Sequence, residues 1–143
     1  MNRQQRHLGR ELALLWLFQI DVGKLPVEEV LKTAPEGIEG VEEEGAFFAQ
    51  QLARGVLGDQ RRIDDAISKY ARGWSLSRMA AVERSILRVA LFEILDVADI
   101  PASVSVDEAV EIAKKYGSEE SGKFVNGILG AFLRGEKDEP QRA

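Results

Sequence analysis

Cysteine is absent from this 143-residue chain, and residue types that often mark catalytic or metal sites are scarce. Without cysteine there is no disulfide, no thiolate zinc site and no cysteine nucleophile, which agrees with a reducing compartment. His7 is the only histidine, and no Walker-type or dinucleotide-binding glycine motif occurs. We therefore predict that the chain is not an enzyme and holds no metal or other cofactor.

Long apolar runs are also missing. The stretch LALLWLF at residues 12–18 is too short to cross a bilayer, and no small-residue cleavage site follows it. The net charge is −5, from 24 acidic and 19 basic side chains. These features predict a soluble, cytoplasmic protein of about one domain that makes no membrane contact.

Proline occurs at only four positions, and no segment alternates apolar and polar residues as a strand would. Helical spacing of apolar residues predicts about seven helices, and Ser105 with Glu108 forms a capping box that would open the sixth. The fold class is therefore all-α, as a single domain of residues 1–143. It would comprise two packed helical sub-bundles, about 1–74 and 75–135, and a polar tail at 136–143. The predicted helices cover residues 3–21, 27–33, 43–57, 60–72, 78–97, 105–116 and 119–134.

Four cationic side chains, Arg3, Arg6, His7 and Arg10, form a basic stripe at the start of the first predicted helix. Their spacing places them within an arc of about 100°. Cations there oppose the positive end of the helix dipole, at a cost of roughly 0.3–1 kcal/mol each. Because local stability disfavours them, the stripe could serve to contact nucleic-acid phosphates. The alternative is a solvated, frayed end of the helix.

The apolar run at 12–18 continues this helix almost all round, so most of it is expected in the core, while Phe18 could face a partner. On the helix predicted over 78–97, Glu83 and Glu93 fall inside an otherwise apolar arc. Each carboxylate needs a cation, several donors, or a rim position that a partner covers. The candidate cations are Arg54, Arg88 and Lys123.

Tyr116 lies beside Lys114 and Lys115 at the end of a predicted helix, and Lys123 follows beyond the Gly117 turn. An aromatic ring near cations at a helix end is suited to stack on an unpaired RNA base. The alternative is a tyrosine that only covers the core.

Three stretches of the sequence, behind a first helix that ends in LWLFQ, resemble a known family. They are ILRVALFEIL (86–95), IPASVSVDEAVEIAKKYG (100–117) and KFVNGILG (123–130). In this order, over essentially the whole chain, they resemble the bacterial NusB family of transcription antitermination factors. The resemblance implies an all-α fold of two helical sub-bundles. It also implies binding to the boxA element of ribosomal RNA transcripts as a heterodimer with NusE, a ribosomal protein of the small subunit. With other Nus factors, this pair would help RNA polymerase to resist termination.

The resemblance also implies roles for individual residues. Phe18 and Glu83 would face NusE. The segment RQQRHLGR has Gln4, Gln5 and His7 where the family often carries further arginines. A homodimer that buries Phe18 or the basic stripe is also open. The RNA-binding residues would be Arg6, His7 and Arg10 of the basic stripe, together with Tyr116, Glu120, Ser121 and Lys123.

Two other functions fit the same residues. The chain could be a helical protein-interaction module, or an accessory domain detached from an RNA methyltransferase. Binding to a boxA oligonucleotide, with and without NusE, separates these functions from an RNA-binding adaptor. If four cations each meet one phosphate of a single strand, log K should fall with log salt with a slope of roughly −3.

Overall fold

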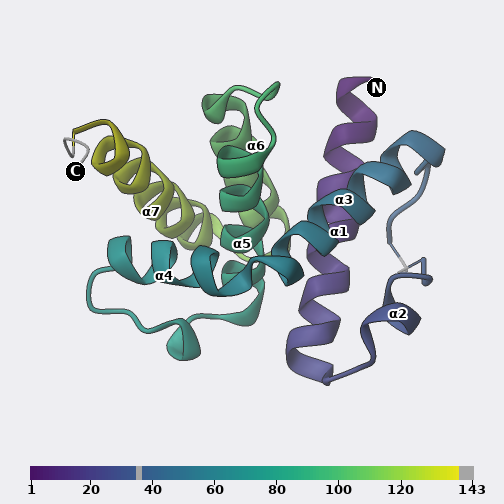
Figure 1. Cartoon of the computed structure of the whole chain (residues 1–143), viewed down its shortest axis with the longest axis horizontal. Coiled ribbons are helices and arrows are strands. Elements are labelled where there is room, and N and C mark those ends of the chain that lie inside the picture. The colour runs from purple at the N-terminus through teal and green to yellow at the C-terminus, as the bar shows by residue number, and fades with distance from the viewer. Residues whose placement is uncertain (35–36, 139–143) are drawn as a thin grey trace. The chain divides into compact units, whose positions relative to one another are not determined.

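The computed structural model describes residues 1–34 and 37–138. Within these ranges the chain forms seven α-helices, one 3-10 helix and no strand, which confirms the predicted all-α class (Figure 1). No helix in the described part has the length and apolar character needed to cross a bilayer. The elements are α1 (Arg3–Gly23), α2 (Val27–Val30), α3 (Glu43–Gly58), α4 (Gln60–Tyr70), η1 (Leu76–Arg78), α5 (Ala81–Asp96), α6 (Ala102–Tyr116) and α7 (Glu119–Asp138).

The chain divides into two compact units, unit 1 (Met1–Asp59) with α1 to α3 and unit 2 (Gln60–Ala143) with α4 to α7. This differs from the predicted division near residue 75. The reason is that α4 packs against α5 and α7, and its apolar side chains Ile63 and Ile67 are fully buried. The helix therefore belongs to the second unit.

In unit 1, α1 and α3 cross at a pair of glycines. A Cβ atom on Gly9 would lie 2.8 Å from the carbonyl oxygen of Gly45 and 3.0 Å from the Phe48 ring, so the crossing requires glycine. Gln5, which is buried, fixes the same contact. Its Nε2 donates to the carbonyl of Gly40 at 3.0 Å, and its Oε1 accepts from the backbone N–H of Glu42 at 2.8 Å.

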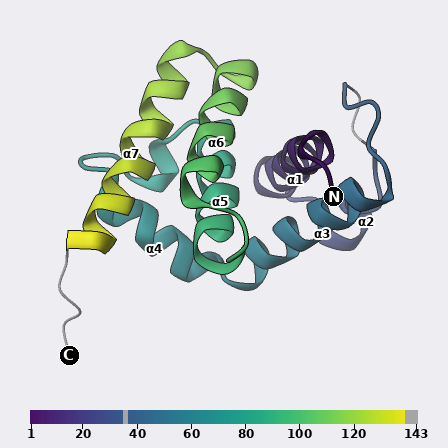
Figure 2. The same ribbon diagram turned by 90° about the horizontal axis from the view of Figure 1, so that it is seen from above.

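In unit 2, α6 and α7 lie side by side and are joined by a short turn (Figure 2), and α5 packs against both. The predicted capping box at the start of α6 is wrong. This helix begins at Ala102 behind Pro101, and Ser105 is buried inside it. Its hydroxyl donates to Glu93 Oε1 on α5 at 2.8 Å instead of capping a helix end.

Helix bounds differ from the predictions at several other ends. The second helix is one turn long, α5 begins at Ala81 after η1, and α7 continues past Gly135 to Asp138. The predicted polar tail therefore begins within α7, and its residues 139–143 lie outside the described part of the chain. So do residues 35 and 36 of the predicted loop at 35–45.

Candidate nucleic-acid interface

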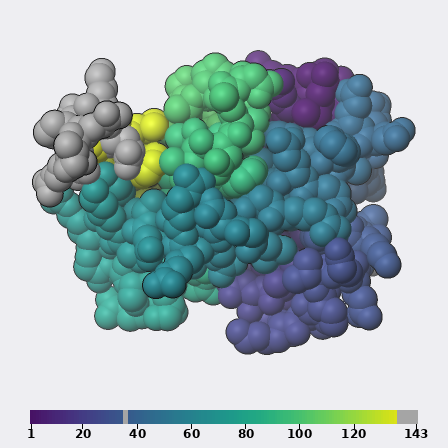
Figure 3. Space-filling model, in the orientation of Figure 1, coloured from purple at the N-terminus to yellow at the C-terminus, as the bar shows by residue number. Residues whose placement is uncertain are grey.

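The start of α1, in purple, reaches the molecular surface (Figure 3). Asn2 caps this helix, because its Oδ1 accepts from the backbone N–H of Gln5 at 2.8 Å. The first turn of the helix holds no acidic residue. The helix is thus capped at Asn2, and Gln5 is hydrogen-bonded to the segment before α3. The start of α1 is therefore ordered and not the frayed end that the sequence also allowed.

The four members of the basic stripe are not equally accessible. Arg3 is exposed, whereas Arg6 and His7 are half-buried. Arg10 is only 3% exposed, and its guanidinium lies 5.6 Å from the centre of the Phe48 ring on α3. The stripe therefore combines an accessible beginning with an end that belongs to the packing of unit 1.

His7 also takes part in the packing of α1. Its Nε2 lies 3.3 Å from Glu11 Oε2, one helical turn further on. Glu11 is 1% exposed, so the contact joins His7 to a buried carboxylate. His7 is therefore partly accessible on the stripe and at the same time contacts Glu11.

The turn between α6 and α7 is built on a close approach at Gly117. A Cβ atom there would overlap the Ser121 hydroxyl and lie 2.9 Å from the carbonyl oxygen of Ala113. Ser118 precedes α7 and caps it, because its hydroxyl accepts from the backbone N–H of Ser121 at 3.2 Å. Ser121 is therefore buried against the turn, and its contribution is to shape it.

The remaining predicted residues of this turn lie at its surface. Tyr116 is half-buried, and the Lys115 ammonium lies 5.4 Å from the centre of its ring. Lys123 and Glu120 are highly exposed and lie 3.5 Å apart on successive turns of α7. An ion pair this exposed contributes little to stability, so Lys123 can leave Glu120 for a phosphate at small cost.

The eight predicted RNA-binding residues thus form two groups, each in its own unit. Unit 1 brings together the stripe on α1, and unit 2 brings together the residues around the α6–α7 turn. In the first group the accessible cations are Arg3 and, in part, Arg6 and His7. In the second, Lys123 is the exposed cation and Tyr116 presents part of an aromatic ring.

The two carboxylates of the apolar arc on α5 have different environments. Glu93 is 1% exposed and accepts the hydrogen bond from Ser105. Glu83 is half-buried in the first turn of α5, where the helix dipole favours an acid. Glu83 therefore keeps part of its surface accessible, whereas Glu93 is enclosed in unit 2.

The three cations considered for these carboxylates pair with other acids. Arg88 makes a bidentate pair with Asp64, at 2.8 and 3.0 Å. Arg54 does the same with Glu28, at 2.9 and 3.0 Å, and this hydrogen bonding lowers the pKa of the Glu28 carboxyl. Lys123 lies beside Glu120, as described above.

The apolar run on α1 is buried as predicted, since five of its seven residues lie in the core. Trp16 is one of them, and its indole N–H donates to the carbonyl of Thr33 at 3.1 Å. Phe18 is half-buried, so part of its ring remains available to a partner.

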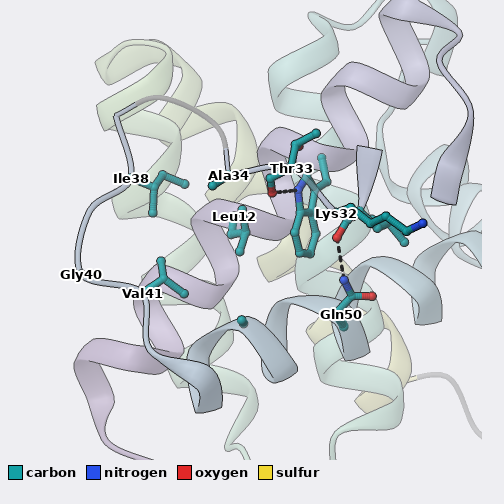
Figure 4. Close-up of a pocket in the computed structure, with 11 residues that line it drawn as sticks. Leu12, Lys32, Thr33, Ala34, Ile38, Gly40, Val41 and Gln50 are labelled. Atoms are coloured by element: carbon teal, nitrogen blue, oxygen red, sulfur yellow. Dashed lines mark hydrogen bonds between the residues drawn. The ribbon is translucent and has the colours of Figure 1, made fainter. Parts of the chain in front are cut away.

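Unit 1 also contains a pocket of about 370 Å³ between α1, α3 and the segment before α3 (Figure 4). Leu12, Trp16 and Val41 contribute apolar walls, and Gln50 closes one side by donating to the carbonyl of Leu31 at 2.8 Å. Among the described residues that line the pocket, Lys32 is the one titratable side chain.

Two buried polar side chains on α1, Gln5 and Glu11, have structural roles that the sequence did not predict. Both are buried polar side chains that organise the neighbourhood of the stripe. The available signal was their polarity within a helix that is otherwise packed against α3, since a buried polar group requires a partner.

Comparison with known proteins matches residues 7–134 to the NusB family. The transcription antitermination protein NusB of Symbiobacterium thermophilum is 45% identical over 92% of this chain and 91% of its own length. The NusB of Heliobacterium modesticaldum is 46% identical over 94% of this chain, which spans 63% of that relative. A crystal structure of antitermination factors NusB and NusE in complex with dsRNA contains a chain that is 27% identical, with a TM-score of 0.83, over 93% of this chain and 98% of that one. The match to the family over nearly all of the chain, together with the all-α structure, shows that the protein belongs to the NusB family.

Proposed function

We propose that the protein is a non-catalytic, cytoplasmic RNA-binding adaptor of transcription antitermination. It binds the boxA element of ribosomal RNA transcripts together with NusE, and with other Nus factors it helps RNA polymerase to resist termination. The observation that carries this proposal is the accessible start of α1, a capped helix with Arg3 exposed and no acid in its first turn. The solved NusB–NusE complex with dsRNA supports it, because one of its chains shares this fold.

On the RNA side, Arg3 and Arg6 contact phosphates and Lys123 contacts a further phosphate in unit 2. Tyr116 stacks on an unpaired base, which is the common mode of reading single-stranded RNA. Glu120, whose carboxylate lies 3.5 Å from the Lys123 ammonium, contacts the RNA beside Lys123. His7 adds a further contact beside Arg6.

Arg10 and Ser121 act through the shape of the site. Arg10 is packed over Phe48 and holds α1 against α3, so it positions the earlier cations of the stripe. Ser121 is buried against Gly117 and fixes the turn that carries Tyr116 and Lys123. Replacing either residue would weaken RNA binding by displacing its neighbours.

On the protein side, Phe18 and Glu83 contact NusE. Each is half-buried, and Glu83 falls within an otherwise apolar arc of α5, where a cation from a partner would compensate the burial of its charge. A second protein would also supply RNA contacts that this chain lacks. The net charge of −5 repels a polyanion at long range, so binding by the local basic groups benefits from an added partner.

The test is a titration of a boxA RNA oligonucleotide with the purified protein, with and without NusE, over a range of salt. If Arg10 keeps its place over Phe48, three cations remain for phosphates, namely Arg3, Arg6 and Lys123. These three cations alone would give log K a slope of about −2 against log salt instead of −3, and each further cation that meets a phosphate would add about −0.7 to the slope. NusE should raise the affinity at every salt concentration.

The same titration separates the alternatives. A helical protein-interaction module would bind NusE and leave the RNA unbound in both arms. An oligonucleotide with a scrambled boxA sequence serves as the control for non-specific attraction to basic groups. Equal affinity for both oligonucleotides, with NusE present, would contradict the proposed function.

A further inference from the structure

Trp74 is an exposed aromatic residue in the segment between α4 and η1. Half of its surface is open to solvent, whereas Trp16, the other tryptophan of the chain, is buried. Trp74 makes an edge-to-face contact with Phe124 of α7. The centres of the two rings lie 5.8 Å apart, and the angle between the ring planes is 76°. The indole is therefore held in a defined position although much of it remains in water.

Arg78 lies against the same ring. Its guanidinium carbon is 5.7 Å from the centre of the indole, and its Nη2 donates to the carbonyl of Gly73 at 3.2 Å. Gly73 has a φ of +78°, a conformation that favours glycine, so the turn before Trp74 depends on this residue. The Gly73 backbone, the Arg78 guanidinium and the Trp74 ring thus hold one another in place.

The charge around Trp74 favours an anionic partner. Arg72 and Arg78 are both exposed, and within residues 1–34 and 37–138 neither forms an ion pair with a carboxylate. Phe124, on which Trp74 packs, directly follows Lys123. The arrangement therefore contacts α7, the helix that carries Lys123.

We propose that Trp74 and Arg78 form a further subsite for an unpaired base of single-stranded RNA. The indole provides a stacking surface for the base, and the guanidinium of Arg78 neutralises a neighbouring phosphate. Stacking on an aromatic ring tolerates any base, so the subsite adds affinity without requiring one sequence. This inference rests on the proposed RNA-binding function and extends it to a segment that the family resemblance did not include.

The first test uses the fluorescence of the unmodified protein. Trp74 is accessible to iodide, whereas Trp16 is shielded in unit 1. Addition of the boxA oligonucleotide should quench the tryptophan emission and protect the remaining signal from iodide. NusE added alone should leave the accessible emission unchanged. Quenching by NusE and none by RNA would overturn the inference and assign the residue to a protein contact.

The second test measures RNA affinity for variants. Trp74→Ala should weaken binding of the oligonucleotide about five- to tenfold, with an unchanged salt slope, because it removes stacking and no charge. Trp74→Phe should recover most of the affinity, and Arg78→Ala should reduce the salt slope. Phe47→Ala on α3 is the control, because Phe47 is the more exposed aromatic residue at 75%.

These outcomes distinguish the two proposals. Wild-type affinity in a folded Trp74→Ala variant, with the wild-type protein still binding boxA RNA, would overturn this subsite alone. No binding by the wild-type protein, with or without NusE, would overturn the proposed function and this inference with it. If Trp74→Ala does not fold, the fluorescence of the wild-type protein gives the decision, because quenching by NusE and none by RNA would overturn the subsite.

Discussion

The start of α1 and the turn between α6 and α7 both carry predicted RNA-binding residues, but they use their charges differently. On α1 the charged side chains become progressively more buried, from the exposed Arg3 to Arg10, which packs on Phe48. At the α6–α7 turn the buried member is the neutral Ser121, and the cation Lys123 stays in solvent. A run of cations in a sequence is therefore a poor measure of the charge offered to a ligand, because packing decides which of them remain accessible.

The largest expected effects concern the cores beneath the two regions. Leu14 in α1 and Leu129 in α7 are almost completely buried, so replacing either with alanine should cost about 2–5 kcal/mol of stability. Urea denaturation measures this cost. Leu133→Ala, at a half-buried position of α7, is the control and should cost less. If only one of the two leucine replacements caused a small loss of stability, the two regions would not be supported by equally well-packed cores.

The next effect separates the two ends of the basic stripe. Arg10→Met should lower the free energy of unfolding by about 2 kcal/mol, because it removes a desolvated contact between the guanidinium and Phe48. Arg3→Ala should change stability by less than about 0.5 kcal/mol, because the side chain is exposed. Thermal melts of both variants, with boxA binding measured alongside, provide the test. If Arg10→Met retained wild-type stability and lost RNA binding, Arg10 would be a direct ligand.

A glycine pair on unit 2 tests the turn itself. Gly117→Ala should cost about 1–3 kcal/mol, because the added Cβ overlaps Ser121. Gly127, within α7, has no atom near the position of an added Cβ, so Gly127→Ala should stabilise the protein by about 0.5–1 kcal/mol. Denaturation curves should move in opposite directions. If the Gly117→Ala variant were as stable as the Gly127→Ala variant, the close approach of Gly117 and Ser121 at the turn would be contradicted.

The smallest effect is expected from a charge pair that belongs to neither region. Hydrogen bonds from Arg54 lower the pKa of Glu28 in the folded state, so this carboxylate contributes stability above its ordinary pKa. The contribution is lost as the pH falls through the lowered pKa. Stability curves of the wild type and Glu28→Gln should therefore differ slightly at neutral pH and converge in acid. A difference that grows as the pH falls would reverse the assigned sign.

The sequence alone was sufficient to predict much of the fold. The apolar spacing along α1, α5 and α7 places most of the core, and the glycines and prolines mark most ends. The start of α6 was misread because an S-x-x-E pattern can also occur inside a helix. At this start Pro101, with its fixed φ, stands before the first helical residue, and Ser105 points to α5.

The candidate sites could be predicted only in part, since their chemistry depends on contacts between segments far apart in the chain. Helical spacing correctly placed the cations on one side of α1, but the burial of Arg10 depends on Phe48, 38 residues further on. Glu93 accepts a hydrogen bond from a serine on the next helix, which no charge pattern would have selected. The exposure of Trp74 likewise follows from the contacts of a turn that has no distinctive sequence period.

The central claim is that RNA lies on the accessible start of α1 and on the α6–α7 turn. The most direct measurement is ultraviolet crosslinking of a boxA oligonucleotide to the complex with NusE, with the attached peptides identified by mass spectrometry. The account predicts crosslinks in peptides that contain residues 3–7 and residues 116–123. Crosslinks confined to other parts of the chain, with both of these peptides unmodified, would contradict it.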